Sequence, residues 1–113
     1  MFSMAVSNTD DHFRNHGFIL SDEGWELSPL YDVNPDIYGE YLSLNVDVDN
    51  SSIDFELAVQ AAPYYGIGKK YAVQEVDKIK NTVRENWKEL AKKYGISRGE
   101  IERMSPAFRE CDR

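Results

Sequence analysis

The stretch Asn8–Asp32 decides how the chain is arranged, and it reads NTDDHFRN, HGFIL, SDEG and WELSPLYD in succession. Two short apolar runs, His16–Leu20 and Trp25–Ser28, are separated by Ser21–Gly24, whose length and glycine are typical of a tight hairpin turn. We therefore predict a β-hairpin. Because paired strands lie about 5 Å apart, the foot of the outgoing arm should lie near the residue that follows the incoming arm.

This predicted return brings polar side chains together. Asn15 lies at the foot of the outgoing arm, Asp32 follows the incoming arm, and Asp10 precedes Asn15 with the spacing D-x-x-x-x-N. In phosphoryl transfer, one aspartate orients the attacking hydroxyl and accepts its proton, while an asparagine and a second aspartate hold magnesium against the nucleotide phosphates. Hard oxygen ligands of this kind suit Mg²⁺. Asp10, Asn15 and Asp32 supply such a set, and ordinary turn and capping chemistry is the alternative.

The other polar residues of the loop have less specific roles. We expect Asp11 to shape the loop or to support the ligand residues from behind, and His16 to begin the strand in a structural role. We expect His12 either to hydrogen-bond within the loop or to be a solvated or core histidine. Arg14 is either a cation that neutralises transferring phosphate or a surface charge.

Composition narrows the class of protein. The chain has 113 residues, 42% hydrophobic and 12% aromatic, enough to bury a core as one domain or as part of a larger one. A net charge of -7 argues against a direct, sequence-independent grip on nucleic acid. The single Cys111 excludes an internal disulfide and fits a reducing compartment. No apolar run approaches the roughly 20 residues of a membrane span, so we expect a cytoplasmic protein that does not contact a membrane.

The first residues suggest that something precedes them. Met1–Val6 reads as the last turns of an apolar helix, expected over residues 1–7, and it leads at once into the polar cluster. A domain seldom starts only a few residues before the cluster of polar residues that carries its predicted function. We expect the chain to be the C-terminal part of a longer protein.

Beyond the hairpin, one extended segment and one short helix are predicted. Pro29 ends the second arm, and the alternation over Leu42–Val48 predicts a half-buried strand or extended segment. Ser51 or Ser52 is the predicted cap of a helix over residues 53–62.

A long helix dominates the C-terminal half. Apolar residues three or four apart predict a helix over residues 69–94 with one apolar stripe, made of Val76, Ile79, Val83, Trp87, Leu90 and Tyr94. We expect this stripe to be core and not a groove for a partner. Gly95 suits the end of this helix, and Ser97–Glu100 has the spacing of a capping box before one last short helix.

The predicted fold class is therefore α+β, mainly α. Residues 1–36 form the catalytic loop, hairpin and metal-binding segment, and residues 37–113 form a helical C-terminal subdomain of the same continuous domain. Gly66–Lys70 lacks the spacing of a phosphate-binding loop and is expected only to separate helices.

Two motifs in this order resemble a known family. NTDDHFRNHGF followed by WELSPLYDVNP is similar to the catalytic segment of HipA-type serine/threonine kinases, the toxins of bacterial toxin–antitoxin modules. The likeness is close over residues 1–36 and looser over the helical remainder. It implies part of a kinase-like catalytic lobe that uses ATP and Mg²⁺ to phosphorylate a serine or threonine of a protein substrate. Asp10 resembles the catalytic base, and Asn15 and Asp32 resemble the ligands of magnesium and nucleotide. The resemblance also implies a DNA-binding antitoxin as partner.

Two parts of a kinase are missing from the sequence. A glycine-rich cover over the phosphates and a strand lysine that positions them are both absent. We therefore expect the chain alone to bind ATP weakly at best and to transfer no phosphate. The alternatives are a non-catalytic helical interaction module and a phosphotransferase that acts on a small molecule.

Overall fold

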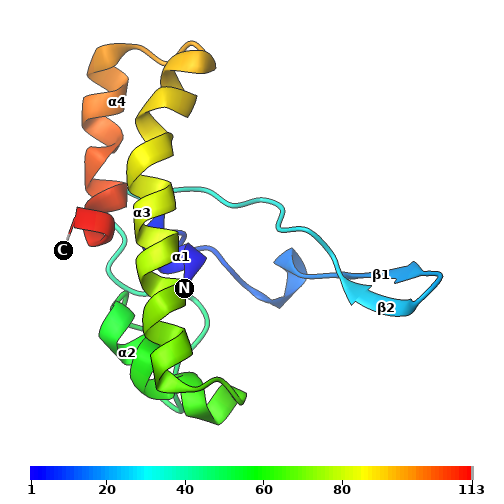
Figure 1. The fold of residues 1–113 in the computed structure, drawn as a ribbon. Helices are drawn as coiled ribbons and strands as arrows, with labels where there is room; N and C mark the ends of the chain where they lie inside the picture. The colour runs from blue at the N-terminus through cyan, green and yellow to red at the C-terminus, as the bar shows by residue number, and fades with distance from the viewer. Residues whose placement is uncertain (113) are drawn as a thin grey trace.

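The computed structural model describes residues 1–112, and one long helix runs through most of its length (Figure 1). The helices are α1 (Phe2–Ala5), α2 (Phe55–Ala61), α3 (Lys69–Lys93) and α4 (Arg98–Met104). Three 3₁₀-helices accompany them, η1 (Phe13–Asn15), η2 (Ala62–Tyr65) and η3 (Ser105–Asp112), and the strands are β1 (Phe18–Ser21) and β2 (Gly24–Leu27). The fold is mainly helical with one antiparallel hairpin, which agrees with the predicted α+β class.

Helix α3 begins and ends close to the predicted bounds. Gly95 has a left-handed φ of 80°, which glycine adopts without strain. The N–H of Gly95 donates to Lys92 O (3.1 Å) and the N–H of Ile96 to Ala91 O (3.0 Å). These bonds form a Schellman motif that satisfies the last carbonyls of the helix.

Helix α4 turns back along α3 and carries the predicted capping box. The Ser97 hydroxyl accepts from Glu100 N (3.3 Å), and the Glu100 carboxylate accepts from Ser97 N (3.4 Å). The chain then continues into η3, where the Phe108 ring stacks on Trp87 of α3 with 4.1 Å between ring centroids. The two ends of this helical pair are therefore fixed by different forces, capping at one end and ring packing at the other.

The core joins the two ends of the chain. Met4, Ala5 and Val6 of the α1 segment are buried in the same cluster as Phe108 and Cys111. Cys111 Sγ donates to Ala5 O (3.2 Å), so residues 106 positions apart are in contact.

Two predictions between the hairpin and α3 differ from the structure. The predicted half-burial holds for Leu42, Leu44 and Val46, which alternate with exposed residues, but Val48 is exposed and no strand forms. The backbone turns back on itself, with Leu42 N donating to Ser51 O and Val46 N to Asn50 O. The only pairing nearby is an isolated bridge between Tyr41 and Ser52. The segment has no second strand beside it, and alternation alone cannot provide one.

The cap of α2 also differs from the prediction. Asp54, not Ser51 or Ser52, is the N-cap, and its Oδ1 accepts from Glu56 N (2.9 Å). Ile53 is buried ahead of it, so the helix starts two residues later than predicted.

The apolar stripe of α3 divides into two parts. Val76 and Val83 are buried as predicted, and Trp87 is half-buried against Phe108. The prediction of a core stripe is wrong at its C-terminal end, where Leu90 is 49% and Tyr94 75% exposed. Helix α4 packs beside that end of α3 but leaves both side chains largely exposed.

The predicted hairpin is confirmed, and it projects from the helical body (Figure 1). Phe18 pairs with Leu27 and Ser21 with Gly24. Ser28 N donates to Gly17 O (2.8 Å), which continues the pairing one step toward the body. Among the helices of residues 1–112, none is both long and apolar enough to cross a membrane.

Candidate functional site

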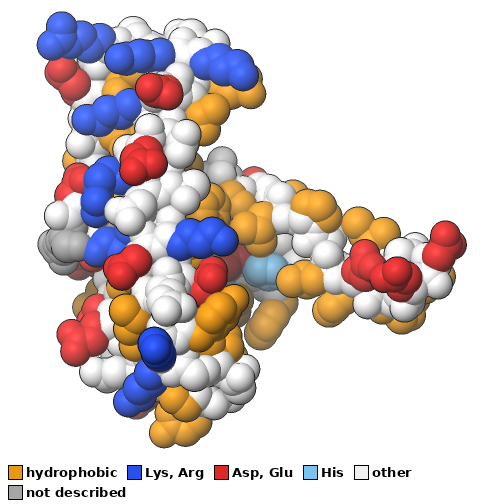
Figure 2. Space-filling model, in the orientation of Figure 1, with side chains coloured by type: hydrophobic (Ala, Val, Ile, Leu, Met, Phe, Trp, Pro, Cys, Tyr) orange, Lys and Arg blue, Asp and Glu red, His pale blue; other side chains and the backbone are white. Residues whose placement is uncertain are grey.

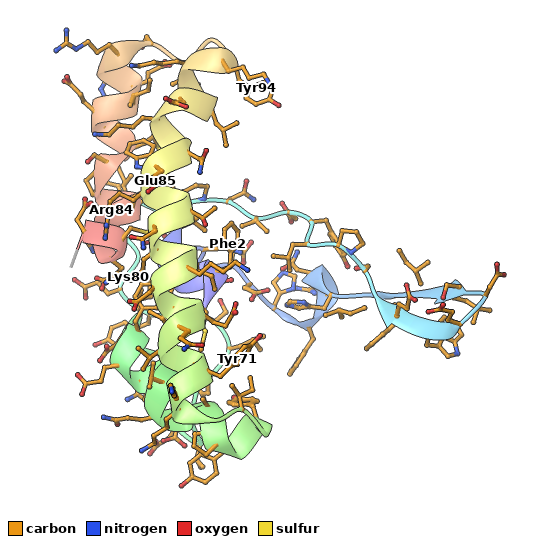
Figure 3. The ribbon with its side chains drawn as sticks, viewed as in Figure 1. Phe2, Tyr71, Lys80, Arg84, Glu85 and Tyr94 are labelled. Carbon is orange, nitrogen blue, oxygen red and sulfur yellow. The ribbon has the colours of Figure 1, made fainter. Side chains whose placement is uncertain are left out.

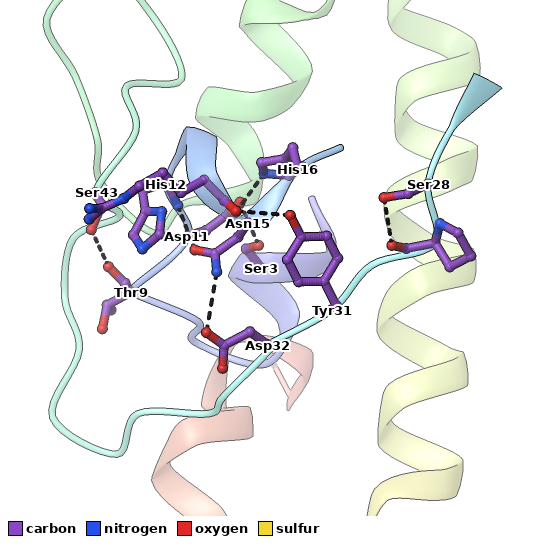
Figure 4. A network of polar contacts seen from close by, with 12 residues as sticks. Ser3, Thr9, Asp11, His12, Asn15, His16, Ser28, Tyr31, Asp32 and Ser43 are labelled. Atoms are coloured by element: carbon purple, nitrogen blue, oxygen red, sulfur yellow. Dashed lines mark hydrogen bonds and ion pairs between the residues drawn. The ribbon is translucent and has the colours of Figure 1, made fainter. Parts of the chain in front are cut away.

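The polar loop lies where the hairpin joins the helical body (Figure 4). Asn15, at the end of η1, is 6% exposed, and its Nδ2 donates to Asp32 Oδ2 (3.3 Å). The predicted meeting of these two residues, 17 positions apart, is therefore confirmed. The hairpin produces this contact because it returns the chain to its own foot.

Asn15 is held in one orientation. Its Oδ1 accepts from His12 N (3.2 Å) while its Nδ2 faces Asp32. The backbone N–H of Asn15 donates in turn to His12 O (2.9 Å), so two bonds between these residues close η1. A carbonyl oxygen has two lone pairs, so Asn15 Oδ1 has one further acceptor position.

Asp32 has an unusual backbone. Its φ is 55°, in the left-handed region that few residues other than glycine adopt and that aspartate and asparagine tolerate best. Its Oδ1 accepts from Asn34 Nδ2 (2.9 Å) and its Oδ2 from Asn15, so both oxygens have neutral amide partners. Residues held in such conformations cluster at functional sites.

Asp10 is less constrained than the other two candidates. Its side chain is exposed, and within residues 1–112 no hydrogen bond or ion pair joins it to Asn15 or Asp32. The structure therefore brings two of the three candidate residues into contact and leaves the third at the solvent-facing side of the loop.

Asp11 and His16 fix the loop to its neighbours. The Asp11 carboxylate accepts from Ser3 Oγ of α1 (3.2 Å), and its other oxygen lies 2.7 Å from His16 Nε2 (Figure 4). The predicted structural role of both residues is confirmed. The partner of Asp11 in α1 was not predictable, because no local pattern indicates Ser3.

A second set of bonds holds Thr9, the residue before Asp10. Thr9 Oγ1 donates to Asp36 Oδ2 (2.9 Å), and Ser43 Oγ donates to Thr9 O (2.5 Å). The N–H of Tyr38 and the Thr9 hydroxyl both donate to Asp36, and they lower the pKa of that carboxyl below its ordinary value. A Cβ added at the buried Gly39 would overlap Thr9 Cγ2, so this approach requires glycine.

Two buried polar atoms beside the loop have no partner among the described residues. They are Oδ1 of Asn8, a residue only 2% exposed, and Nδ1 of His12. An unpaired buried acceptor normally costs about 1–3 kcal/mol. Sequence reasoning gave Asn8 no role of its own, and nothing in the sequence pattern shows that its side chain is buried.

A tyrosine ties the two feet of the hairpin together. The hydroxyl of Tyr31 donates to Arg14 O (2.8 Å). Arg14 directly precedes Asn15 in the sequence, and Tyr31 directly precedes Asp32. The Arg14 side chain itself is exposed. The backbone of Arg14 therefore has a structural role, while both predictions for its guanidinium stay open.

The side-chain types of Asn15 and Asp32 are ones that magnesium takes when it is shared with a phosphorylated ligand. Mg²⁺ in nucleotide sites takes one or two carboxylates and completes its shell with phosphates and waters. Asp32 would provide the carboxylate and Asn15 its amide oxygen; in this structure Asn15 Nδ2 faces Asp32, and Asn15 Oδ1 faces His12 N. Within residues 1–112, no group of three or more His, Cys, Asp or Glu side chains is placed to hold a metal ion.

The sequence was compared with known protein families, and one family matches it. The sequence pattern of the HipA-like C-terminal domain matches residues 1–107. Neither a protein of curated function nor a solved structure matches the chain.

Proposed function

Because the chain belongs to the family of HipA-like C-terminal domains, we propose that it is the C-terminal portion of the catalytic lobe of a serine/threonine kinase. The reaction is transfer of the γ-phosphate of ATP to a hydroxyl of a protein. The observation that carries the proposal is the contact between Asn15 and Asp32, two oxygen-bearing side chains that local folding brings together at a strained backbone position.

Each of the three residues has a separate role in the proposed reaction. Asn15 and Asp32 hold magnesium and, through it, the nucleotide phosphates. Asp10 orients the substrate hydroxyl and accepts its proton, and its exposed carboxylate is accessible to a protein substrate. Magnesium bound with ATP would neutralise charge on the phosphates.

The surrounding bonds support this division of roles. Asp11 ties the loop to α1 and to the start of β1, so the backbone on the C-terminal side of Asp10 is fixed. Thr9 is fixed on the other side by Asp36 and Ser43. Asp10 thus has an exposed side chain on a restrained backbone, which suits a base that must meet an incoming hydroxyl.

We further propose that the chain alone transfers no phosphate. Gly66 and Gly68 separate η2 from α3 and form no cover over a nucleotide. A second lobe must supply the glycine-rich cover and the lysine. A DNA-binding antitoxin in the cytoplasm is the expected regulatory partner, and with a net charge of -7 this chain would leave DNA contact to it.

Manganese, a paramagnetic substitute for magnesium, tests the metal site without any need for activity. We expect low concentrations of Mn²⁺ to broaden the NMR amide signals of Asn15 and Asp32 selectively. Asp32→Asn keeps the shape and tolerates the left-handed backbone but removes the charge, so it should abolish the selective broadening. Asp22→Asn, at the exposed hairpin turn, is the matched control and should broaden like the wild type. Equal broadening of Asp32→Asn and wild type would contradict the proposed site.

Radiolabelled ATP tests whether the isolated chain is inactive. We expect no label in the 113-residue protein or in an added protein substrate after incubation with ATP and Mg²⁺. Incorporation that disappears in Asp10→Asn would show that the chain is a complete kinase by itself.

A further inference from the structure

One face of the hairpin is apolar and uncovered. Side chains of paired strands alternate between the two faces, and residues directly opposite each other share a face. The pairs Phe18–Leu27 and Leu20–Trp25 therefore form one face. Their exposed fractions are 69%, 62%, 65% and 72% in that order. The other face carries Ile19 opposite Glu26.

Such a face is unstable in water on its own. A two-stranded hairpin is at best marginally stable without a third element to cover it, and contiguous exposed apolar patches mark interaction sites. The hairpin extends away from the helices, and none of them packs on it (Figures 1 and 2). Its apolar face is therefore an interaction surface.

A complementary apolar groove lies on the helical body. It is a cavity of about 540 Å³ along the C-terminal half of α3 and beside α4. Its lining includes Phe2, Trp87, Leu90, Tyr94, Ile96 and Met104. Phe2 of α1 and Tyr94, which follows α3, lie on the same side of α3 in Figure 3, and both side chains are partly exposed.

Charge indicates which surfaces attract each other. Residues 1–56 carry twelve acidic and one basic side chain, whereas residues 57–113 carry eight acidic and twelve basic. The hairpin bears Asp22, Glu23 and Glu26 at and beside its turn, where Figure 2 shows a red patch. The upper end of the α3–α4 pair is rich in Lys and Arg in the same view. Lys93 lies there, with Nζ 5.9 Å from the Tyr94 ring centroid.

We propose that the hairpin of one copy docks into the α3–α4 groove of a second copy, and that two copies exchange hairpins to form a closed dimer. The apolar face of the hairpin meets the apolar groove, and its acidic turn meets the basic end of the helical pair. Face-to-face stacking of two hairpins is disfavoured because it would bring two acidic turns together. One-way docking would leave a free groove and a free hairpin at the ends and would build open chains.

The size of the contact is sufficient. If each of the four hairpin side chains and an equal area of groove lose roughly 120 Å² per residue, one contact buries roughly 1,000 Å². Two reciprocal contacts then exceed the roughly 1,600 Å² of a standard stable interface. Dimer formation is measured without metal or nucleotide, so its failure is distinguishable from failure of the metal site at Asn15 and Asp32.

Sedimentation or light scattering of the 113-residue protein tests the dimer. We expect a dimer at low ionic strength and a dissociation constant that rises with salt, because the charged part of the contact is screened. A monomer at all concentrations would overturn the inference, and this is the result expected if the groove and hairpin instead serve a separate lobe. A dimer strengthened by salt would also overturn it, because it indicates hairpin-on-hairpin stacking.

Variants of the two surfaces locate the contact. Leu20→Ser with Trp25→Ser should give a monomer, as should Leu90→Ser with Tyr94→Ser, whereas Ile19→Ser on the opposite hairpin face should remain dimeric. Mixing the two monomeric variants should restore a heterodimer, because one hairpin and one groove are intact in the pair. Lys92→Glu with Lys93→Glu should raise the dissociation constant about fivefold at low salt. Failure of the mixture to associate, with circular dichroism showing that both variants are folded, would overturn the exchange.

Discussion

The helical body and the hairpin arm are stabilised in different ways. In the body, residues from opposite ends of the chain pack together, as Ala5 and Cys111 do through a buried hydrogen bond. In the arm, the strands pair only with each other, and the four side chains of one face are exposed. Burial within this chain therefore stabilises the body, whereas the arm depends on the hydrogen bonds between its two strands and on whatever docks against it. The candidate site lies at the joint between the two.

The largest expected difference comes from removing one aromatic ring from each region. Phe108→Ala deletes the ring that stacks on Trp87 in the body and should lower the free energy of unfolding by about 3–5 kcal/mol. Trp25→Ala deletes a larger ring, 72% exposed, from the arm and should change it by less than about 0.5 kcal/mol in the monomer. Urea unfolding followed by circular dichroism measures both. Similar losses in the two variants would remove the distinction between body and arm.

A second comparison uses two glycines of the body. An added Cβ at Gly39 overlaps Thr9 Cγ2, so Gly39→Ala should destabilise the protein by about 1–3 kcal/mol and displace the loop that carries Asp10. At Gly99, inside α4, an added Cβ meets nothing within 4 Å. Gly99→Ala should therefore stabilise the protein by about 0.5–1 kcal/mol. Thermal unfolding measures the change in stability of each variant. An unchanged unfolding midpoint in Gly39→Ala would show that Thr9 is free to move.

The smallest expected effect is a pH dependence at the joint. Hydrogen bonds from Tyr38 N–H and Thr9 lower the folded-state pKa of Asp36 below its ordinary value of 3.8. The stabilisation is therefore present above that ordinary value and is lost as the pH falls through the lowered folded-state pKa. Asp36→Asn should make the unfolding midpoint less sensitive to pH below about pH 4, and Asp54→Asn, at the cap of α2, is the control carboxylate. Equal acid sensitivity of wild type and Asp36→Asn would contradict the assignment.

Sequence reasoning succeeded where the determining contacts are local. The hairpin turn, the glycine end of α3 and the capping box of α4 depend on residues a few positions apart. The contact between Asn15 and Asp32 was predictable for the same reason, because a hairpin brings its own two feet together.

The predictions that failed depend on the environment of a segment and not on its pattern. Leu42–Val48 alternates like a strand, yet a strand needs a partner and this loop has none. Leu90 and Tyr94 continue the spacing of a buried stripe, yet the described chain leaves them largely exposed. The bond between Asp11 and Ser3 and the burial of Asn8 arise because α1 packs against the C-terminal segment, and no periodicity reports that.

The hydroxyl of Ser7 donates to the carbonyl of Ala107 (2.6 Å), so the residue that opens the polar loop is held by one that the ribosome adds a hundred residues later. During synthesis at about 5–20 residues per second, the loop emerges several seconds before its support. α1 also needs Cys111 and Phe108 to complete the cluster that buries it. The nascent chain therefore passes through a period in which its hairpin and helices can form but the proposed catalytic loop cannot be assembled. The support of the loop is therefore complete only after residues 107–111 have been synthesised.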